Sequence, residues 1–176
     1  AFFHATDGAT GVELWRTDGT PEGTALVKDV RPGSATSEPW VPIAVGGSLY
    51  FLADDGVHGR ELWRTDGTDA GTVLVKDIHP GPAHGAAGLY AGPAGVFLAA
   101  DDGVHGLELW KSDGTEAGTV LVKDVVPGSS GVQFSYQGRS AAIVGGHFFV
   151  SLDDGTHGPE LWRSDGTEAG TQRVRD

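Results

Sequence analysis

Short apolar segments alternate with segments rich in Gly, Asp and Thr along the whole chain, and four kinds of apolar segment recur in one order. Their shortness and their content of β-branched and aromatic residues predict strands rather than helices. The third kind contains ELW and the fourth resembles VLVKDI. We expect first strands at Pro42–Val45, Leu89–Ala91 and Ala141–Val144, and second strands that include Ser48–Ala53 and Phe148–Leu152.

The segments between these strands have the composition of tight turns. Gly46-Gly47 and Gly145-Gly146 separate first from second strands, and Asp-Gly pairs lie between the later strands. Glycine adopts positive φ at little cost, as such hairpin turns require. The pattern therefore predicts a repeating four-stranded antiparallel meander.

The ELW strand predicts how these sheets pack. Leu and Trp are adjacent in it, so they point to opposite faces of the sheet, and both faces must be covered. Sheets stacked face to face around an axis provide that cover, whereas a β-solenoid has shorter coils and a sandwich does not repeat its sequence. We therefore predict an all-β fold, a β-propeller built of four-stranded antiparallel blades.

The repeat itself is explicit. ELW begins at residues 13, 61, 108 and 160, so successive copies are 48, 47 and 52 residues apart. Each ELW is followed by [RK]-[TS]-D-G-T-x-x-G-T and preceded by D-G-x-[HT]-G. We treat 1–176 as a single propeller region, with repeat units at approximately 1–33, 34–81, 82–128 and 129–176.

The register of the repeat predicts an incomplete first unit. Alignment of Asp7 with Asp55, Asp102 and Asp154 places the first residue at a second strand and the last residue just after a fourth strand. The chain also contains no Met. We expect about four consecutive blades that form an open arc or part of a larger ring. The remaining blades of a longer chain, or a second copy in a homodimer, would complete the ring.

The copies ELWRTDGTPEGT, ELWRTDGTDAGT, ELWKSDGTEAGT and ELWRSDGTEAGT resemble the bacterial ELWxxDGT-repeat family. The resemblance covers nearly the whole chain and implies a secreted or cell-surface bacterial protein, without implying a reaction or a ligand. The S/T-x-D-G-T piece is also similar to the Asp-box of sialidase-type propellers. It lacks the aromatic residue that closes that box, so sialidase activity is not implied.

Composition narrows the classes of partner. The net charge of −12 disfavours nucleic acid and anionic membranes, because no basic surface is present to bind phosphates. The chain has no Cys, which excludes disulfides and cysteine-based zinc sites, and no apolar run long enough for membrane insertion. Cations, neutral sugars and basic proteins remain as partners.

Most of the repeated residues have a structural interpretation. Asp18, Asp66, Asp113 and Asp165 of DGTxxGT are expected to be structural turn residues, accepting backbone N–H groups and a Thr hydroxyl. A calcium ion at these Asp-rich turns is the functional alternative, and we predict no other cofactor and no metal site. The repeated Trp residues at 15, 63, 110 and 162 are expected to be buried, and the Glu of ELW to pair with Lys or Arg.

The turn before ELW and the linkers between units hold the candidate ligand-binding residues. Histidine and aspartate repeat in three of the turns, where they allow a cation site or a plain solvated turn. The linkers vary in sequence and contain aromatic residues, which either contact a ligand or fill gaps between blades. These turns and linkers emerge at one end of the meander. The candidates are Trp40, Asp54, His58, Tyr90, Asp101, His105, Phe134, Tyr136, Asp153 and His157.

Three functions are consistent with these features. The first is a non-catalytic extracellular recognition or scaffold propeller that binds a glycan or protein ligand, since four near-identical units offer the same groups repeatedly. The second is a fragment of a propeller hydrolase of the glycosidase type whose catalytic blades are absent here, because catalysis needs a unique pair of carboxylates. The third is a purely structural assembly module.

Overall fold

The computed structural model describes residues 1–134 and 141–174, so the predicted site residue Tyr136 lies outside the described residues. Within this part of the chain every regular element is a strand. No helix long and apolar enough to cross a membrane occurs among the described residues.

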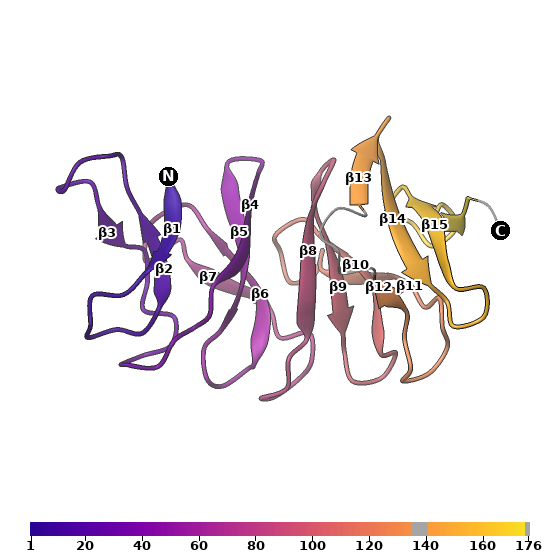
Figure 1. The fold of residues 1–176 in the computed structure, drawn as a ribbon, viewed down its shortest axis with the longest axis horizontal. Coiled ribbons are helices and arrows are strands. Elements are labelled where there is room, and N and C mark those ends of the chain that lie inside the picture. The colour runs from indigo at the N-terminus through magenta and orange to yellow at the C-terminus, as the bar shows by residue number, and fades with distance from the viewer. Residues whose placement is uncertain (135–140, 175–176) are drawn as a thin grey trace.

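The strands form four antiparallel sheets that follow one another in sequence (Figure 1). The first sheet has three strands, β1 (Phe2–Ala5), β2 (Glu13–Arg16) and β3 (Ala25–Leu26). The second has β4 (Trp40–Val45), β5 (Ser48–Asp54), β6 (Arg60–Thr65) and β7 (Val73–Lys76). The third has β8 (Ala86–Gly92), β9 (Gly95–Asp101), β10 (Leu107–Ser112) and β11 (Val120–Lys123). The fourth has β12 (Gln133–Phe134), β13 (Ala141–Val144), β14 (His147–Asp153), β15 (Pro159–Ser164) and β16 (Gln172–Arg173).

Each sheet is a meander, in which neighbours in sequence are neighbours in the sheet. The orders β4-β5-β6-β7 and β8-β9-β10-β11 match the predicted four-strand unit, and the first sheet lacks the strand that would precede β1. In the fourth sheet β12 and β13 both pair with β14, so two short strands occupy one edge. The all-β class and the antiparallel meanders are confirmed.

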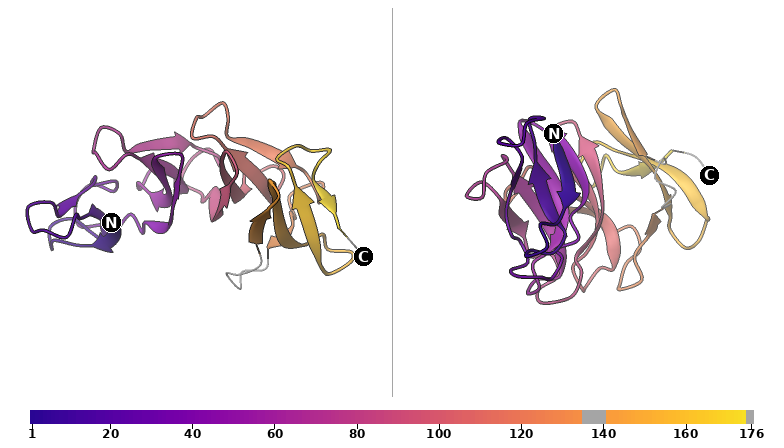
Figure 2. Two further views of the ribbon diagram at one scale, coloured as in Figure 1. Left: turned by 90° about the horizontal axis from the view of Figure 1, so that it is seen from above. Right: turned by 60° about the vertical axis from the view of Figure 1, so that its left-hand side comes forward.

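The four sheets lie side by side along an open arc. Figure 2 shows the curvature, and Figure 1 places the N-terminus and the C-terminus at opposite ends of the molecule. The first strands of neighbouring sheets contact each other, β4 with β8 and β8 with β13. Among residues 1–134 and 141–174 no sheet closes on itself, and the first and fourth sheets lie at opposite ends of the arc.

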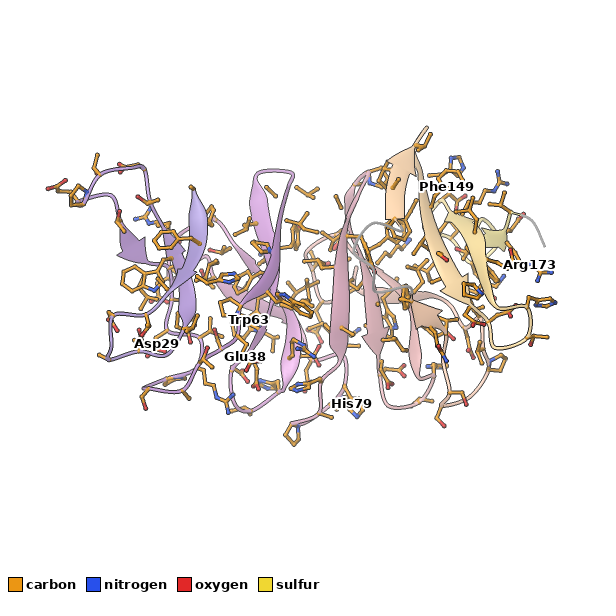
Figure 3. The ribbon with its side chains drawn as sticks, in the orientation of Figure 1. Asp29, Glu38, Trp63, His79, Phe149 and Arg173 are labelled. Atoms are coloured by element: carbon orange, nitrogen blue, oxygen red, sulfur yellow. The ribbon has the colours of Figure 1, made fainter. Side chains whose placement is uncertain are left out.

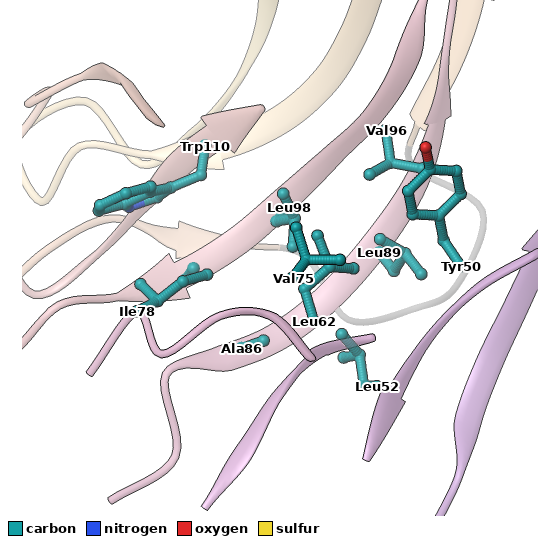
Figure 4. Packing of buried hydrophobic residues seen from close by; sticks show 11 residues of the cluster. Tyr50, Leu52, Leu62, Val75, Ile78, Ala86, Leu89, Val96, Leu98 and Trp110 are labelled. Carbon is teal, nitrogen blue, oxygen red and sulfur yellow. The ribbon is translucent and has the colours of Figure 1, made fainter. Parts of the chain in front are cut away.

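Apolar side chains fill the space between successive sheets (Figure 3). Between the second and third sheets, Leu52, Leu62 and Val75 from one side meet Leu98 and Trp110 from the other (Figure 4). The other two interfaces repeat this arrangement, with the Leu of ELW from one sheet and the Trp of ELW from the next in a single cluster. The opposite orientation of adjacent Leu and Trp therefore produces the stack.

Three of the four repeated Trp residues are buried as predicted. Trp63, Trp110 and Trp162 are 6%, 6% and 7% exposed, because each packs on the preceding sheet. The prediction is wrong for Trp15, which is only half-buried. It lies in the first sheet, and none of the described residues covers that face.

Lysine side chains add polar links between sheets. Lys76 donates to the carbonyl of Thr119 over 3.0 Å and Lys123 to that of Thr171 over 3.0 Å, so each reaches the DGTxxGT hairpin of the following sheet. Lys28 makes the corresponding contact with Asp69. The Lys of VKD thus connects the outer part of one sheet to the next, which fixes how successive sheets are oriented.

Replacing Trp110 by Ala is expected to lower the free energy of unfolding by roughly 3–5 kcal/mol, because it removes a buried ring between two sheets. Trp40→Ala is the matched control: Trp40 is 52% exposed, and we expect a loss of about 1 kcal/mol or less from its contact with Arg60. Urea denaturation followed by circular dichroism measures both. Equal losses would contradict the packing described.

Candidate functional site at the linker end

Two kinds of loop meet at one end of every sheet, as the sequence predicts. We call it the linker end: it comprises the turns at 6–11, 54–59, 101–106 and 153–158 and the inter-sheet linkers at 30–39, 78–85 and 125–132. Gly59 lies so close to the carbonyl of Ala83 that any added Cβ would collide with it, and Gly11 lies equally close to Ala35. The last Gly of the first three turns, at 11, 59 and 106, is therefore required by the linker that packs on it, whereas a Cβ added at Gly158 would meet nothing within 4 Å.

The Glu of ELW holds the linker in place. Glu13 and Glu61 are fully buried, and Glu61 accepts hydrogen bonds from the backbone N–H groups of Ile78 and His79 at 3.1 and 3.2 Å. Glu13 accepts the N–H and the hydroxyl of Ser37. The predicted ion pair with Lys or Arg is wrong, because the carboxylate lies under the linker, where backbone donors surround it.

Burial makes these carboxyl groups weak acids. Desolvation raises the pKa of Glu61 to about 8 and that of Glu108 to about 7, although backbone N–H groups oppose the shift in both. Asp77 and Asp124 lie near enough to raise these pKa values further. Both Glu side chains are 0% exposed, so neither can reach a bound substrate.

The repeated histidines pair with the second Asp of each turn, whereas the candidates named from the sequence are the first Asp. The ring Nδ1 of His58 lies 2.7 Å from Asp55, and that of His105 lies 2.8 Å from Asp102, within the same turn. Asp54 instead accepts the N–H of Gly56 and forms an ion pair with Arg31 at 3.1 Å. In the third sheet Asp101 likewise accepts the N–H of Gly103. In the fourth sheet His157 pairs with Asp154, and Asp153 accepts the N–H of Gly155.

Hydrogen bonds within these pairs shift the pKa of His58, His105 and Asp154. The hydrogen bond to Asp55 raises the pKa of His58, and that to Asp102 raises the pKa of His105. The hydrogen bond from His157 lowers the pKa of Asp154 to about 2. Each pair thus links the two ends of its turn by a hydrogen bond, and in the first unit the hydroxyl of Thr10 takes the place of the imidazole and donates to Asp7.

Two of the predicted aromatic residues lie in the space between sheets. Phe134 is 3% exposed, and Tyr90 stacks on it with a centroid distance of 6.5 Å. Tyr90 also packs on Phe148, which stacks on Phe97 at 4.5 Å. Phe134 offers almost no surface to a ligand. These residues fill the gap between the third and fourth sheets, which was the other interpretation of the linker aromatics.

Trp40 is placed differently, because it lines an open cavity. The cavity has a volume of about 530 Å³ and lies between the first and second sheets at the linker end. Trp40 is 52% exposed, and the guanidinium of Arg60 lies over its ring at 5.8 Å from the centroid. The lining residues are His4, Val12, Thr36, Glu38, Pro39, Trp40 and Arg60. The cavity therefore joins an aromatic surface to charged groups of both signs.

The backbone beside Trp40 is strained. Glu38 has a φ of 48°, which is the only positive value among the described non-glycine residues. Thr36 holds this part of the linker, since its hydroxyl donates to the carbonyl of Val12 at 2.8 Å and accepts the N–H of Glu38 at 3.2 Å. Strained residues of this kind cluster at functional sites.

Of the residues that line this cavity, the sequence pointed only to Trp40. His4, Thr36, Glu38 and Arg60 were missed, because no repeated motif marks them.

The DGTxxGT hairpins lie at the opposite end and form closed turns. Asp66 Oδ1 accepts the N–H and the hydroxyl of Thr68 at 2.9 and 2.7 Å, and the same contacts recur at Asp18, Asp113 and Asp165. A Cβ at Gly71 would collide with the Asp66 carboxylate, which explains the second Gly of the motif.

Within the described residues no group of three or more His, Asp or Glu side chains is arranged to hold a metal ion.

No family model and no curated protein matches the chain. Among solved structures, the crystal structure of the computationally designed Ika8 protein is similar, at 20% identity and a TM-score of 0.48. The match covers 99% of this chain and 45% of the designed chain, so the chain spans less than half the length of that protein. At this degree of likeness we draw neither fold nor function from it.

Asp66→Ala should lower the urea midpoint of unfolding, because the N–H and the hydroxyl of Thr68 lose their common acceptor. The hydrogen bonds lower the pKa of Asp66, so the stabilisation is present above the ordinary Asp pKa and is lost as the pH falls through the folded value. The control is Glu116→Ala, an exposed acidic residue in the corresponding hairpin of the third sheet. A midpoint no lower than that of the control would show that the turn does not depend on Asp66.

Stability should fall as the pH rises from about 5 to 8. The folded-state pKa values of Glu61 and Glu108 lie above the ordinary 4.5, so the folded chain retains protons that the unfolded chain releases in this window. His58 acts in the same direction, because its pKa is raised in the folded chain. The resulting stabilisation is fully present below the ordinary His pKa of 6.5 and is lost as the pH rises through the folded-state pKa of His58. Melting temperatures of the chain at pH 5.5 and 8.0 test this.

The double variant Glu61→Gln, Glu108→Gln should show a smaller difference between the two pH values. Its melting temperature should also be lower at both, because an amide NH₂ replaces one acceptor of the linker N–H groups. An unchanged pH dependence in the double variant would mean that these carboxyl groups do not cause it.

Proposed function

We propose that the four sheets are consecutive blades of a β-propeller and that the chain is a non-catalytic recognition module that binds a glycan outside the cell. The propeller proposal is supported by four successive meanders of like sequence, stacked face to face along an arc, with the first strands of neighbouring sheets in contact. Stacked sheets of this kind hold the loops at their ends on a rigid scaffold, as a binding surface requires.

The observation that carries the glycan proposal is the exposed Trp40 beside the cavity. A half-exposed indole ring offers a flat apolar surface on which the C–H face of a sugar ring packs. His4, Glu38 and Arg60 supply donors and acceptors around it for the sugar hydroxyls. The volume of about 530 Å³ is in the range of small-molecule sites and suits a short oligosaccharide.

The placement of the carboxyl groups argues against hydrolysis. A glycosidase needs two carboxylic side chains on opposite sides of the scissile bond. Of the residues that line the Trp40 cavity, only Glu38 carries a carboxylate. Glu61 and Glu108 have the raised pKa of a general acid, but they are buried under the linkers. Recognition without catalysis is therefore the function that these residues support best.

The proposed location and ligand class rest on sequence. The resemblance to the ELWxxDGT-repeat family implies a secreted or surface protein, where glycans are the abundant ligands. A net charge of −12 repels polyanionic ligands, so we propose a neutral glycan. A ligand of this class adds no charge to the cavity and is held by stacking and hydrogen bonds.

Binding to an array of neutral and acidic oligosaccharides tests the proposal, followed by calorimetry with the neutral oligosaccharide that binds most strongly. Trp40→Ala should weaken this binding at least tenfold, which corresponds to about 1.4 kcal/mol, because the stacking surface is lost. Glu38→Gln should weaken it by a smaller factor and leave the fold intact, since Glu38 is exposed.

His58→Ala and His105→Ala are the controls, since both residues lie at the linker end but outside the cavity. They should bind as the unchanged chain does. Loss of binding in these variants together with full binding by Trp40→Ala would move the site to the His–Asp turns. An array on which no glycan binds would overturn the proposed function.

A further inference from the structure

The three interfaces between sheets are built from equivalent residues. On the side facing the next sheet, the Leu of ELW is 1%, 0% and 0% exposed at Leu14, Leu62 and Leu109. The Val of VKD accompanies it and is also buried, at Val27, Val75 and Val122. In each case the covering surface is the Trp face of the following sheet. The Leu face and the Trp face therefore form a matched pair.

The last sheet presents a Leu face that no described residue covers. Leu161 is 47% exposed and Val174 is 48% exposed, although they occupy the positions of the buried Leu62 and Val75. Val174 also donates its N–H to the carbonyl of Leu161 at 2.8 Å, as Val27 does to Leu14 at 2.9 Å. The backbone of this face is thus formed in the same way as in the covered sheets, and only its cover differs.

The first sheet presents the complementary Trp face. Phe3, Trp15 and Leu26 are direct cross-strand partners, so they lie on one face of the sheet. The corresponding residues of the second sheet, Phe51 and Trp63 among them, pack against Leu14 and Val27. The N-terminal and C-terminal faces lie at opposite ends of the arc, so one chain cannot bring them together without a change of shape (Figure 1).

We propose that the Leu161 face of one chain binds the Trp15 face of a second copy of the same chain. The three interfaces inside the chain show which surface fits the Leu face, and a second copy carries that surface. The contact is head-to-tail, joining two different patches. Propellers generally have about 4–8 blades, so two chains of four sheets would close a ring of eight through two such contacts. This inference is independent of the glycan proposal.

Light scattering coupled to size exclusion tests the inference on residues 1–176. The expected mass is twice the chain mass of 18.2 kDa, independent of concentration over the upper micromolar range. Leu161→Lys and Trp15→Glu should each give monomers, because each variant places a charge in both contacts of the dimer. If Trp15→Glu lowers the circular dichroism signal of the fold, Leu26→Glu on the same face takes its place.

An equimolar mixture of Leu161→Lys and Trp15→Glu should form dimers again. In the mixed dimer one contact is unchanged and the other joins the new Lys to the new Glu. Val57→Lys is the control, since Val57 is 63% exposed in a turn away from both faces and should leave the dimer intact.

Each other outcome overturns the inference. A mass of 18.2 kDa at all concentrations would show that a second copy does not cover the two faces. Dimers that survive Trp15→Glu but not Leu161→Lys, with no restoration on mixing, would show that two Leu faces pair with each other. Growth into species larger than a dimer would overturn the ring closed by two chains.

Discussion

The packing of Leu and Trp from one strand onto two different neighbours is the interaction on which the rest of the structure depends. Adjacent residues of a strand point to opposite faces, so Leu62 packs towards the third sheet while Trp63 packs towards the first. No single sheet can bury both of its faces. The repeat is therefore stable only as a stack, and the exposure of Leu161 and the partial burial of Trp15 are direct consequences of the same rule at its two ends.

The second constraint is the buried glutamate that precedes this pair. Glu61 accepts backbone N–H groups of the linker that leads to the next sheet, so the strand that sets the packing also fixes the path of the chain. The motif ELW thus performs three tasks in three successive residues: Glu anchors the linker, Leu contacts the next sheet, and Trp contacts the previous one. A carboxyl group is tolerated at this buried position because it accepts hydrogen bonds from linker N–H groups that have no strand partner.

Most of the fold was predictable from the sequence, because each of its determinants is repeated. Strand positions, turn positions and the two apolar faces follow from the period of the sequence and from the alternation within ELW. The role of Glu61 was not predictable, since the sequence shows an acidic residue repeated in every unit but not the linker backbone that covers it. The partner of His58 was also missed, because Asp54 and Asp55 are adjacent and only the turn geometry places Asp55 against the imidazole.

The candidate site was predictable only in part, because it lies where the repeat breaks down. Trp40 could be found as an aromatic residue in a variable linker, yet Tyr90 and Phe134 fit the same description and pack between sheets. What separates them is the neighbouring sheet. Tyr90 and Phe134 are covered between the third and fourth sheets, where they pack on each other and Tyr90 packs on Phe148, whereas Trp40 lies beside the three-stranded first sheet, where the cavity is open. Repeated residues thus maintain the stack, and the candidate site lies where the linker 34–39 departs from the repeat and Glu38 has a positive φ.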